Sequence, residues 1–147
     1  MSLSDNDKSQ KSSGNNLGKD LSEILIRDTM SKKLITAPSS TTIYQISKMM
    51  EQGIGAILVK KDSTTIGIIT DRDFAIKIAA NKYPLDTVVE KVTTVPLQTI
   101  ESNQSLLDAA KKMSSKKIRK LVVVENTQIV GIITSSDLIN QISLLQK

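Results

Sequence analysis

The sequence predicts an α/β chain built from a duplicated subdomain, and three observations lead to this prediction. The phrase GIITDRDF at residues 67–74 returns as GIITSSDL at residues 131–138, with five of eight positions identical. The copies begin 64 residues apart, and the same shift aligns the preceding segments without a gap. Short β-branched runs alternate with segments of helical apolar spacing. Each copy of about 60 residues is small for a core of its own, so the copies should pack together with pseudo-twofold symmetry.

The duplication sets the expected organisation of the chain. Residues 1–20 are rich in Ser, Asn, Lys and Gly, which predicts a disordered N-terminal tail. A first repeat is then expected over residues 21–84 and a second over residues 85–147. Pro84 should end the last helix of the first repeat.

Each repeat is expected to begin with an amphipathic helix. A hydroxyl residue, Thr41 in one copy and Ser105 in the other, is the expected N-cap. The apolar face is predicted from three- and four-residue spacing. Its members are Ile43, Ile46 and Met50 in the first copy and Leu107, Ala110 and Met113 in the second.

A β-hairpin and a closing helix are expected to follow. The runs 56–59 and 121–124 are β-branched and too short for helices, so each should be a buried strand. A polar turn leads to the second strand, at 66–70 or 129–134. The closing helices are predicted over residues 74–80 and 138–145.

Composition excludes several classes of function. The chain has no Cys and no His, so disulfides, thiolate nucleophiles, His-based triads and typical zinc sites are excluded. No apolar run approaches the roughly 20 residues that span a bilayer, and the N-terminus lacks the apolar part of a secretory signal. We therefore expect a cytoplasmic protein without a membrane partner.

The net charge of +5 is concentrated in one segment. Residues 111–120, KKMSSKKIRK, hold six basic residues and no acid. Such a run is usually a solvated helix face, and it can also be an anion site.

The repeated phrase has two interpretations. A Thr three residues before an Asp at a helix start is close to a capping box, in which each side chain binds the other's backbone N–H. The same geometry can serve a ligand: a helix N-terminus attracts phosphate, and a fixed carboxylate can accept hydrogen bonds from a ribose. The local pattern alone favours the capping box.

The two copies together resemble a tandem CBS-domain protein, or Bateman module, over residues 24 to about 145. The resemblance rests on IRDTMSKKLITA as opening segment, on IGAILV and IRKLVVV as central strands, and on the two closing phrases. The second opening segment, VEKVTTVPLQTI, departs mildly, because Thr94 stands where the gapless alignment has Met30.

The resemblance implies adenine-nucleotide or adenosyl ligands in two clefts between the repeats. The leading cleft would hold a ribose on Asp137 and phosphates on basic side chains. Its implied residues are Thr29, Leu34, Ile54, Arg119, Lys120, Thr134, Ser136 and Asp137. The second cleft would use Thr70, Arg72, Asp73, Thr93, Gln98 and Ile118. It ranks lower because Gln98 is polar, and because Gly55 and Ala56 replace the basic pair.

The predicted function is therefore a regulatory, energy-sensing module without catalytic residues, catalytic cofactor or metal. AMP, ADP, ATP and adenosyl compounds are the expected ligands. A homodimer formed through helices carrying Met49, Met50, Leu144 and Leu145 is expected, as is an unidentified regulated protein. The alternative is a nucleic-acid-binding protein, favoured by the basic run and a pI near 9.4. The basic run contains no aromatic residues that could stack on nucleobases, which argues against this alternative.

Overall fold

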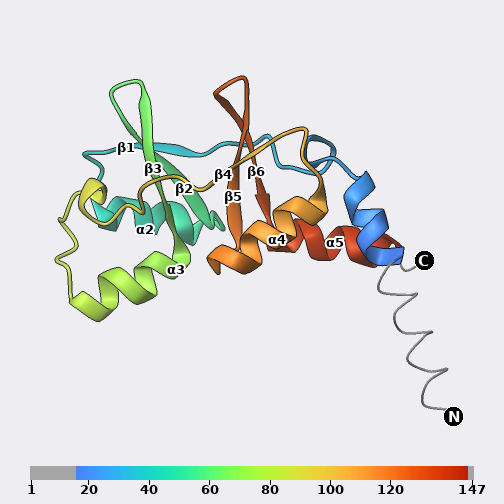
Figure 1. Ribbon diagram of the computed structural model, residues 1–147. Helices are drawn as coiled ribbons and strands as arrows, with labels where there is room; N and C mark the ends of the chain where they lie inside the picture. Colours follow the sequence, from blue (N-terminus) through green and yellow to red (C-terminus); the bar gives the residue numbers. More distant parts are fainter. Residues whose placement is uncertain (1–15, 146–147) are drawn as a thin grey trace, which may run out of the picture. The chain divides into compact units, whose positions relative to one another are not determined.

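The computed structural model describes residues 16–145, and its contacts divide the chain into two units (Figure 1). Unit 2 is the continuous segment Leu34–Leu97. Unit 1 combines the chain up to Lys33 with the chain from Gln98 onward. The predicted α/β class is confirmed, because each unit has a three-stranded mixed sheet with flanking helices.

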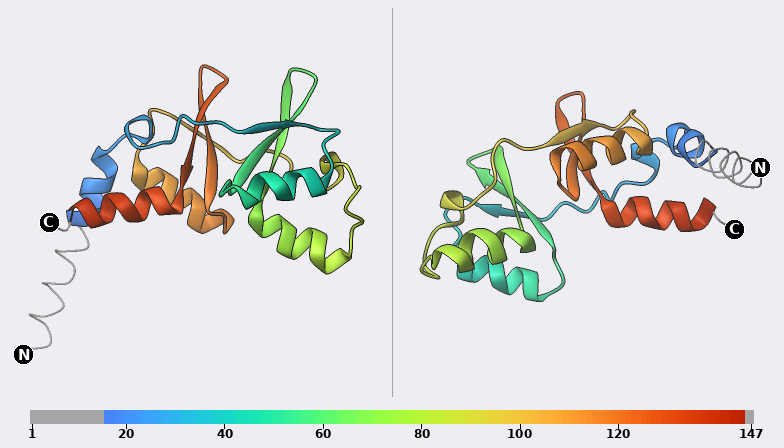
Figure 2. Two further views of the ribbon diagram at one scale, coloured as in Figure 1. Left: turned by 180° about the vertical axis from the view of Figure 1, so that it is seen from behind. Right: turned by 60° about the horizontal axis from the view of Figure 1, so that its bottom comes forward.

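The sheet of unit 2 has the order β1-β2-β3. Strand β1 (Thr36–Pro38) runs parallel to β2 (Ala56–Lys61), and β2 forms an antiparallel hairpin with β3 (Thr64–Thr70). Its helical elements are α2 (Ile43–Glu51), the short α3 (Asp71–Asp73), its π-helical continuation (Phe74–Ala79) and a 3-10 turn (Val89–Lys91). The hairpin loop lies at the end of the hairpin away from these helices (Figure 2).

The sheet of unit 1 repeats this arrangement in the order β4-β5-β6. Strand β4 (Thr99–Glu101) is parallel to β5 (Lys120–Glu125), which pairs antiparallel with β6 (Gln128–Thr134). The helices are α4 (Leu106–Lys116) and α5 (Ser135–Leu145), with a 3-10 turn at Ile26–Asp28.

Each unit has its own aliphatic core. In unit 2, Ile43, Ile46 and Ile57 are fully buried, as the spacing predicted for the first helix and strand. Met49 and Met50 pack against this same cluster and stay half-buried, so part of each side chain reaches the surface. In unit 1, Leu144 and Leu145 are exposed.

The opening segment of each sequence repeat packs on the strands of the other repeat, and both partners then belong to the same structural unit. Ser31 exchanges two backbone hydrogen bonds of 2.9 Å with Ile132 of β6. In unit 2, Thr94 exchanges bonds of 2.9 and 3.2 Å with Ile68 of β3. The sequence repeats 21–84 and 85–147 and the structural units therefore divide the chain differently. The repeat boundary describes the duplication and stays a prediction.

The gapless 64-residue alignment holds for the hairpin strands and the closing helices and fails before them. From the 3-10 turn to the first helix of each sheet the copies correspond at a shift of 63 residues: Ile26–Asp28 matches Val89–Lys91, and the N-cap Thr42 matches Ser105. The expected N-cap Thr41 is therefore wrong, and Ser105 is confirmed. Leu106 and Ala109 are buried where Leu107 and Ala110 were expected.

The shift has a local cause in α4. The left-handed residue that ends the first helix is Gly53, with φ 93°, and the residue that ends α4 is Lys117, with φ 56°. The segment from N-cap to left-handed residue is thus one residue longer in unit 1. Consequently Thr94 corresponds to Ser31 and Thr93 to Met30, which corrects the pairing of Thr94 with Met30.

The described part of the chain begins in a helix at residues 16–23. Leu17 and Leu21 lie four residues apart and pack against the core of unit 1, which explains why this polar segment is helical. Residues 16–20 therefore differ from the predicted tail, and residues 1–15 lie outside the described residues. Both closing helices also begin three residues earlier than predicted, at Asp71 and Ser135, because the preceding Thr caps them.

Candidate functional site

The second repeated phrase builds a capping box at the end of β6. The backbone N–H and the hydroxyl of Thr134 donate to Asp137 Oδ2 at 2.8 and 3.0 Å. The Thr134 hydroxyl in turn accepts from the Asp137 N–H at 3.2 Å. These bonds fix a half-buried carboxylate at the N-terminus of α5, where the helix dipole favours negative charge.

The first phrase builds the same box at the end of β3. The N–H and hydroxyl of Thr70 donate to Asp73 Oδ2 at 2.8 and 3.1 Å, and the Asp73 N–H donates to the Thr70 hydroxyl at 3.4 Å. The capping interpretation of both phrases is thus confirmed. Capping uses one carboxylate oxygen of each acid and leaves the other for a second role.

The two acids differ at that other oxygen. Asp73 Oδ1 accepts a hydrogen bond of 3.2 Å from the Thr94 hydroxyl and lies 3.6 Å from the ammonium nitrogen of Lys77. Among residues 16–145, Asp137 Oδ1 has no hydrogen bond or ion pair. A carboxylate offers about four acceptor positions, so Asp137 keeps capacity for a ligand.

A glycine in each phrase brings the opening segment against the strand. A Cβ on Gly131 would lie 2.7 Å from both the Met30 sulfur and the Ser31 carbonyl oxygen. A Cβ on Gly67 would overlap Thr93 Cγ2 and lie 2.5 Å from the Thr94 carbonyl oxygen. Glycine is therefore required here for close backbone approach, as its place in a strand suggested.

Thr29 carries an unsatisfied polar atom beside this approach. Its hydroxyl oxygen is buried and has no hydrogen-bond partner in the described part of the chain. By contrast, the buried Thr93 hydroxyl of unit 2 donates to the Val89 carbonyl at 2.7 Å. Buried polar groups are normally paired, so an orphan hydroxyl at a position implied to face a base is a functional signal.

The implied phosphate-binding residues lie where β5 begins. Lys120 pairs with Thr134 across the hairpin, so the two side chains leave the same face of the sheet. The Arg119 carbonyl accepts from the Ser135 N–H at 2.8 Å, and the side chains of Arg119 and Ser136 are exposed. Unit 2 has Ala56 paired with Thr70 in this place.

The implied residues divide between the two units. Unit 1 holds Thr29, Gln98, Ile118, Arg119, Lys120, Thr134, Ser136 and Asp137. Unit 2 holds Leu34, Ile54, Thr70, Arg72, Asp73 and Thr93. The sharing of each cleft by residues of both units stays a prediction. Sequence reasoning missed Lys77, although its spacing of four residues from Asp73 on a helix is a recognisable signal for an ion pair.

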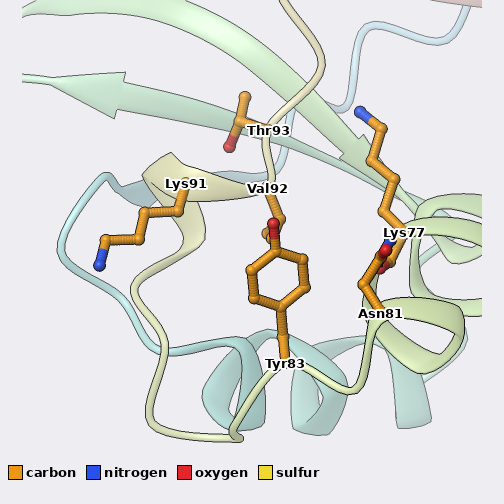
Figure 3. Close-up of a pocket in the computed structure, with 6 residues that line it drawn as sticks. All are labelled: Lys77, Asn81, Tyr83, Lys91, Val92 and Thr93. Atoms are coloured by element: carbon orange, nitrogen blue, oxygen red, sulfur yellow. The ribbon is translucent and has the colours of Figure 1, made fainter.

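A pocket of about 200 Å³ lies inside unit 2 (Figure 3). Its lining residues are Lys77, Asn81, Tyr83, Lys91, Val92 and Thr93. The ammonium groups of Lys77 and Lys91 point to opposite sides of the Tyr83 ring, so they do not converge on one anion (Figure 3).

Residues 16–145 contain no cluster of three or more acidic, His or Cys side chains able to hold a metal ion. None of the helices in this described range is both long and apolar enough to cross a membrane.

This arrangement, two copies of a hairpin followed by a capped helix with an acid at its start, is that of the CBS domain. The chain belongs to the CBS domain family, whose sequence pattern matches residues 22–80 and 89–144. The resemblance found in the sequence is thus confirmed.

Three relatives show how far the similarity extends. The CBS domain-containing protein YhcV of Bacillus subtilis is 34% identical over 120 residues, which is 80% of this chain and 86% of YhcV. The crystal structure of an uncharacterized conserved protein from Pyrococcus horikoshii superposes with a TM-score of 0.77 at 31% identity, covering 82% of this chain and 92% of that one. The CBS domain pair of protein MJ0100 is 30% identical, with a TM-score of 0.70 over 80% of this chain and 98% of the pair. It was crystallised in complex with 5′-methylthioadenosine and S-adenosylmethionine.

Proposed function

We propose that this chain is a regulatory sensor that binds an adenosyl compound or an adenine nucleotide such as AMP, ADP or ATP, with the ribose on Asp137. One observation carries the proposal: the Asp137 carboxylate is fixed at a helix N-terminus with Oδ1 free among the described residues. The orphan hydroxyl of Thr29 supports it, as does the ligand pair bound by the similar CBS pair of MJ0100.

A thermal-unfolding panel tests this proposal. We expect at least one of AMP, ADP, ATP, S-adenosylmethionine and 5′-methylthioadenosine to raise the midpoint of unfolding. A ligand at 100 times its dissociation constant adds about 2.7 kcal/mol, which corresponds to about 5–10 °C for a chain of this size. NAD and GTP serve as comparison ligands. No shift with any adenine compound would refute the proposed function.

Replacing Thr29 by Val tests the contact with the base. Val has nearly the same shape, and it is the residue that unit 2 has at the corresponding Val92. Loss of an unpaired buried hydroxyl should leave the free protein as stable or slightly more stable. Loss of a hydrogen bond to the ligand should weaken binding by about five- to tenfold, measured by calorimetric titration.

Thr93→Val is the matched control. The Thr93 hydroxyl already donates to Val89, so its loss should lower the free energy of unfolding by about 1 kcal/mol and leave the affinity unchanged. An unaltered affinity of Thr29→Val would show that the orphan hydroxyl has no part in binding.

Phosphate recognition by the start of β5 gives a further prediction. The double change Arg119→Ala/Lys120→Ala should lower the affinity for ATP and ADP clearly more than the affinity for adenosine. Added salt should also weaken ATP binding to the unchanged protein, because attraction between exposed charges is screened. Titrating both ligands into both proteins checks this. Equal losses for ATP and adenosine would assign the basic residues to another role.

Nucleic acid is the second candidate ligand, favoured by the exposed Lys111, Lys116 and Lys117 on and after α4. Lys112 of the same run instead donates to the Thr99 carbonyl. A steep salt dependence of oligonucleotide affinity would support this candidate.

The remaining expectations stay proposals: a cytoplasmic location, a non-catalytic role, a regulated protein partner and a homodimer. In the homodimer proposal, the exposed Ile139 of α5 joins the four expected contact residues, of which Leu144 and Leu145 are exposed and Met49 and Met50 are half-buried. Sedimentation equilibrium giving only the monomer mass at high micromolar concentration would exclude the homodimer.

A further inference from the structure

The two units present their repeated acid in different states. Lys77 follows Asp73 by four residues, and its ammonium donates to the Thr94 hydroxyl at 2.7 Å while lying 3.6 Å from Asp73 Oδ1. The Thr94 hydroxyl donates to the same carboxylate oxygen. Lys77, Thr94 and Asp73 thus form a closed polar triangle around Oδ1. The Asp73 side chain keeps only 14% of its surface exposed.

Unit 1 lacks this triangle. The residue that corresponds to Lys77 at the 64-residue shift is Gln141 of α5, which is uncharged. The residue that corresponds to Thr94 at the 63-residue shift is Ser31. The Ser31 hydroxyl accepts from the Lys33 N–H at 3.3 Å. Neither residue hydrogen-bonds Asp137 in the described part of the chain.

We infer that Lys77 determines which of the two acids accepts a ligand: its ammonium closes the Asp73 site to a ribose, so the chain takes one adenosyl ligand, at Asp137. This inference rests on the proposed function and adds the stoichiometry and the residue that sets it.

The physical reason is competition for one carboxylate oxygen. The Thr94 hydroxyl already donates to Asp73 Oδ1, and the Lys77 ammonium lies 3.6 Å from the same oxygen. A pair of ribose hydroxyls that binds this oxygen would have to take the place of Thr94 and move Lys77. The carboxylate would then exchange a neighbouring positive charge for donors that carry no charge. On Asp137 the ribose meets an open oxygen and displaces no protein group.

Calorimetric titration with 5′-methylthioadenosine tests the inference. This probe has no phosphate and no net charge, so Lys77 does not attract it through a phosphate group. We expect one site per chain in the unchanged protein, and Asp73→Asn should leave that site intact. Lys77→Gln copies unit 1 into unit 2 and should raise the stoichiometry to two sites per chain. Adding Asp73→Asn to Lys77→Gln should return it to one.

The reverse change is an independent test that leaves unit 2 untouched. Gln141→Lys places an ammonium four residues after Asp137. It should lower the affinity for 5′-methylthioadenosine by about tenfold, the effect of one charge-assisted hydrogen bond. Gln141→Met, of similar length and without charge, is its control and should bind as the unchanged protein does. Thermal unfolding confirms that each variant is folded. If Lys77→Gln does not fold, Lys77→Met takes its place.

Several results would overturn the inference. One is a folded Lys77→Gln variant that still binds a single ligand. Another is an unchanged protein that binds two ligands and loses one with Asp73→Asn. In both cases the proposed function would stand, because ligand would still bind. Absence of 5′-methylthioadenosine binding to every variant, together with no shift from any adenine compound in the thermal panel, would instead refute the proposed function and the inference with it.

Discussion

Asp137→Asn is expected to weaken adenosyl binding by tenfold to a hundredfold, whereas Asp73→Asn should change it little. Hydrogen bonds to a charged acceptor contribute about 1.5–3 kcal/mol, and Asp137 is the acid whose second oxygen is open within the described residues. The corresponding oxygen of Asp73 is occupied by Thr94 and Lys77. Calorimetric titration of both variants with one adenine ligand measures the difference.

Asn is preferred to Ala because its carbonyl can still accept from the Thr134 N–H and preserve the cap. The Ala variants supply the comparison: each should lower the free energy of unfolding by about 1 kcal/mol, since both acids cap a helix. If the two Asn variants lose ligand equally, the acids are equivalent. If neither loses ligand while both Ala variants lose stability, the repeated phrase serves only to cap helices.

The strands and the repeated phrase could be predicted from sequence because their register is fixed by pairing. Lys120 faces Thr134 and Ala56 faces Thr70, so the 64-residue shift persists through both hairpins and into the acids. A strand cannot gain one residue without turning its buried side chains to the other face. The identity of Asp73 and Asp137 as the matched acids was secure for this reason.

The segments before the strands could not be aligned from sequence, because a helix tolerates an added residue. Lys117 ends α4 in the left-handed conformation that Gly53 has in the other copy, and a Lys gives no sequence signal for that conformation. The extra residue moves the whole opening segment by one position. The contact of Thr94 with Asp73 was missed as a result, because the gapless alignment pairs Thr94 with Met30 instead of Ser31.

Gly67→Ala is expected to have the largest effect on stability of any single change considered. Its Cβ would overlap Thr93 Cγ2 and approach the Thr94 carbonyl oxygen, and the latter is backbone that is hydrogen-bonded to Ile68. Overpacking against such neighbours costs about 1–3 kcal/mol or more, which lowers the midpoint of unfolding by several degrees. Gly131→Ala should cost less, because the Met30 side chain can move aside, although the Ser31 carbonyl cannot. Chemical denaturation of both variants measures the free energies of unfolding.

Gly18→Ala is the matched control, because it adds the same methyl group where no atom lies within 4 Å. Gly18 lies inside the helix at residues 16–23, where Ala is favoured over Gly by about 0.5–1 kcal/mol, so this variant should be more stable than the unchanged protein. Gly131→Ala should also lower the affinity for the adenosyl ligand, because it displaces Met30 and with it the neighbouring Thr29. Gly67→Ala should leave the affinity of the Asp137 site unchanged in the folded fraction. A Gly131→Ala variant that loses stability but keeps full affinity would show that the opening segment takes no part in binding the ligand.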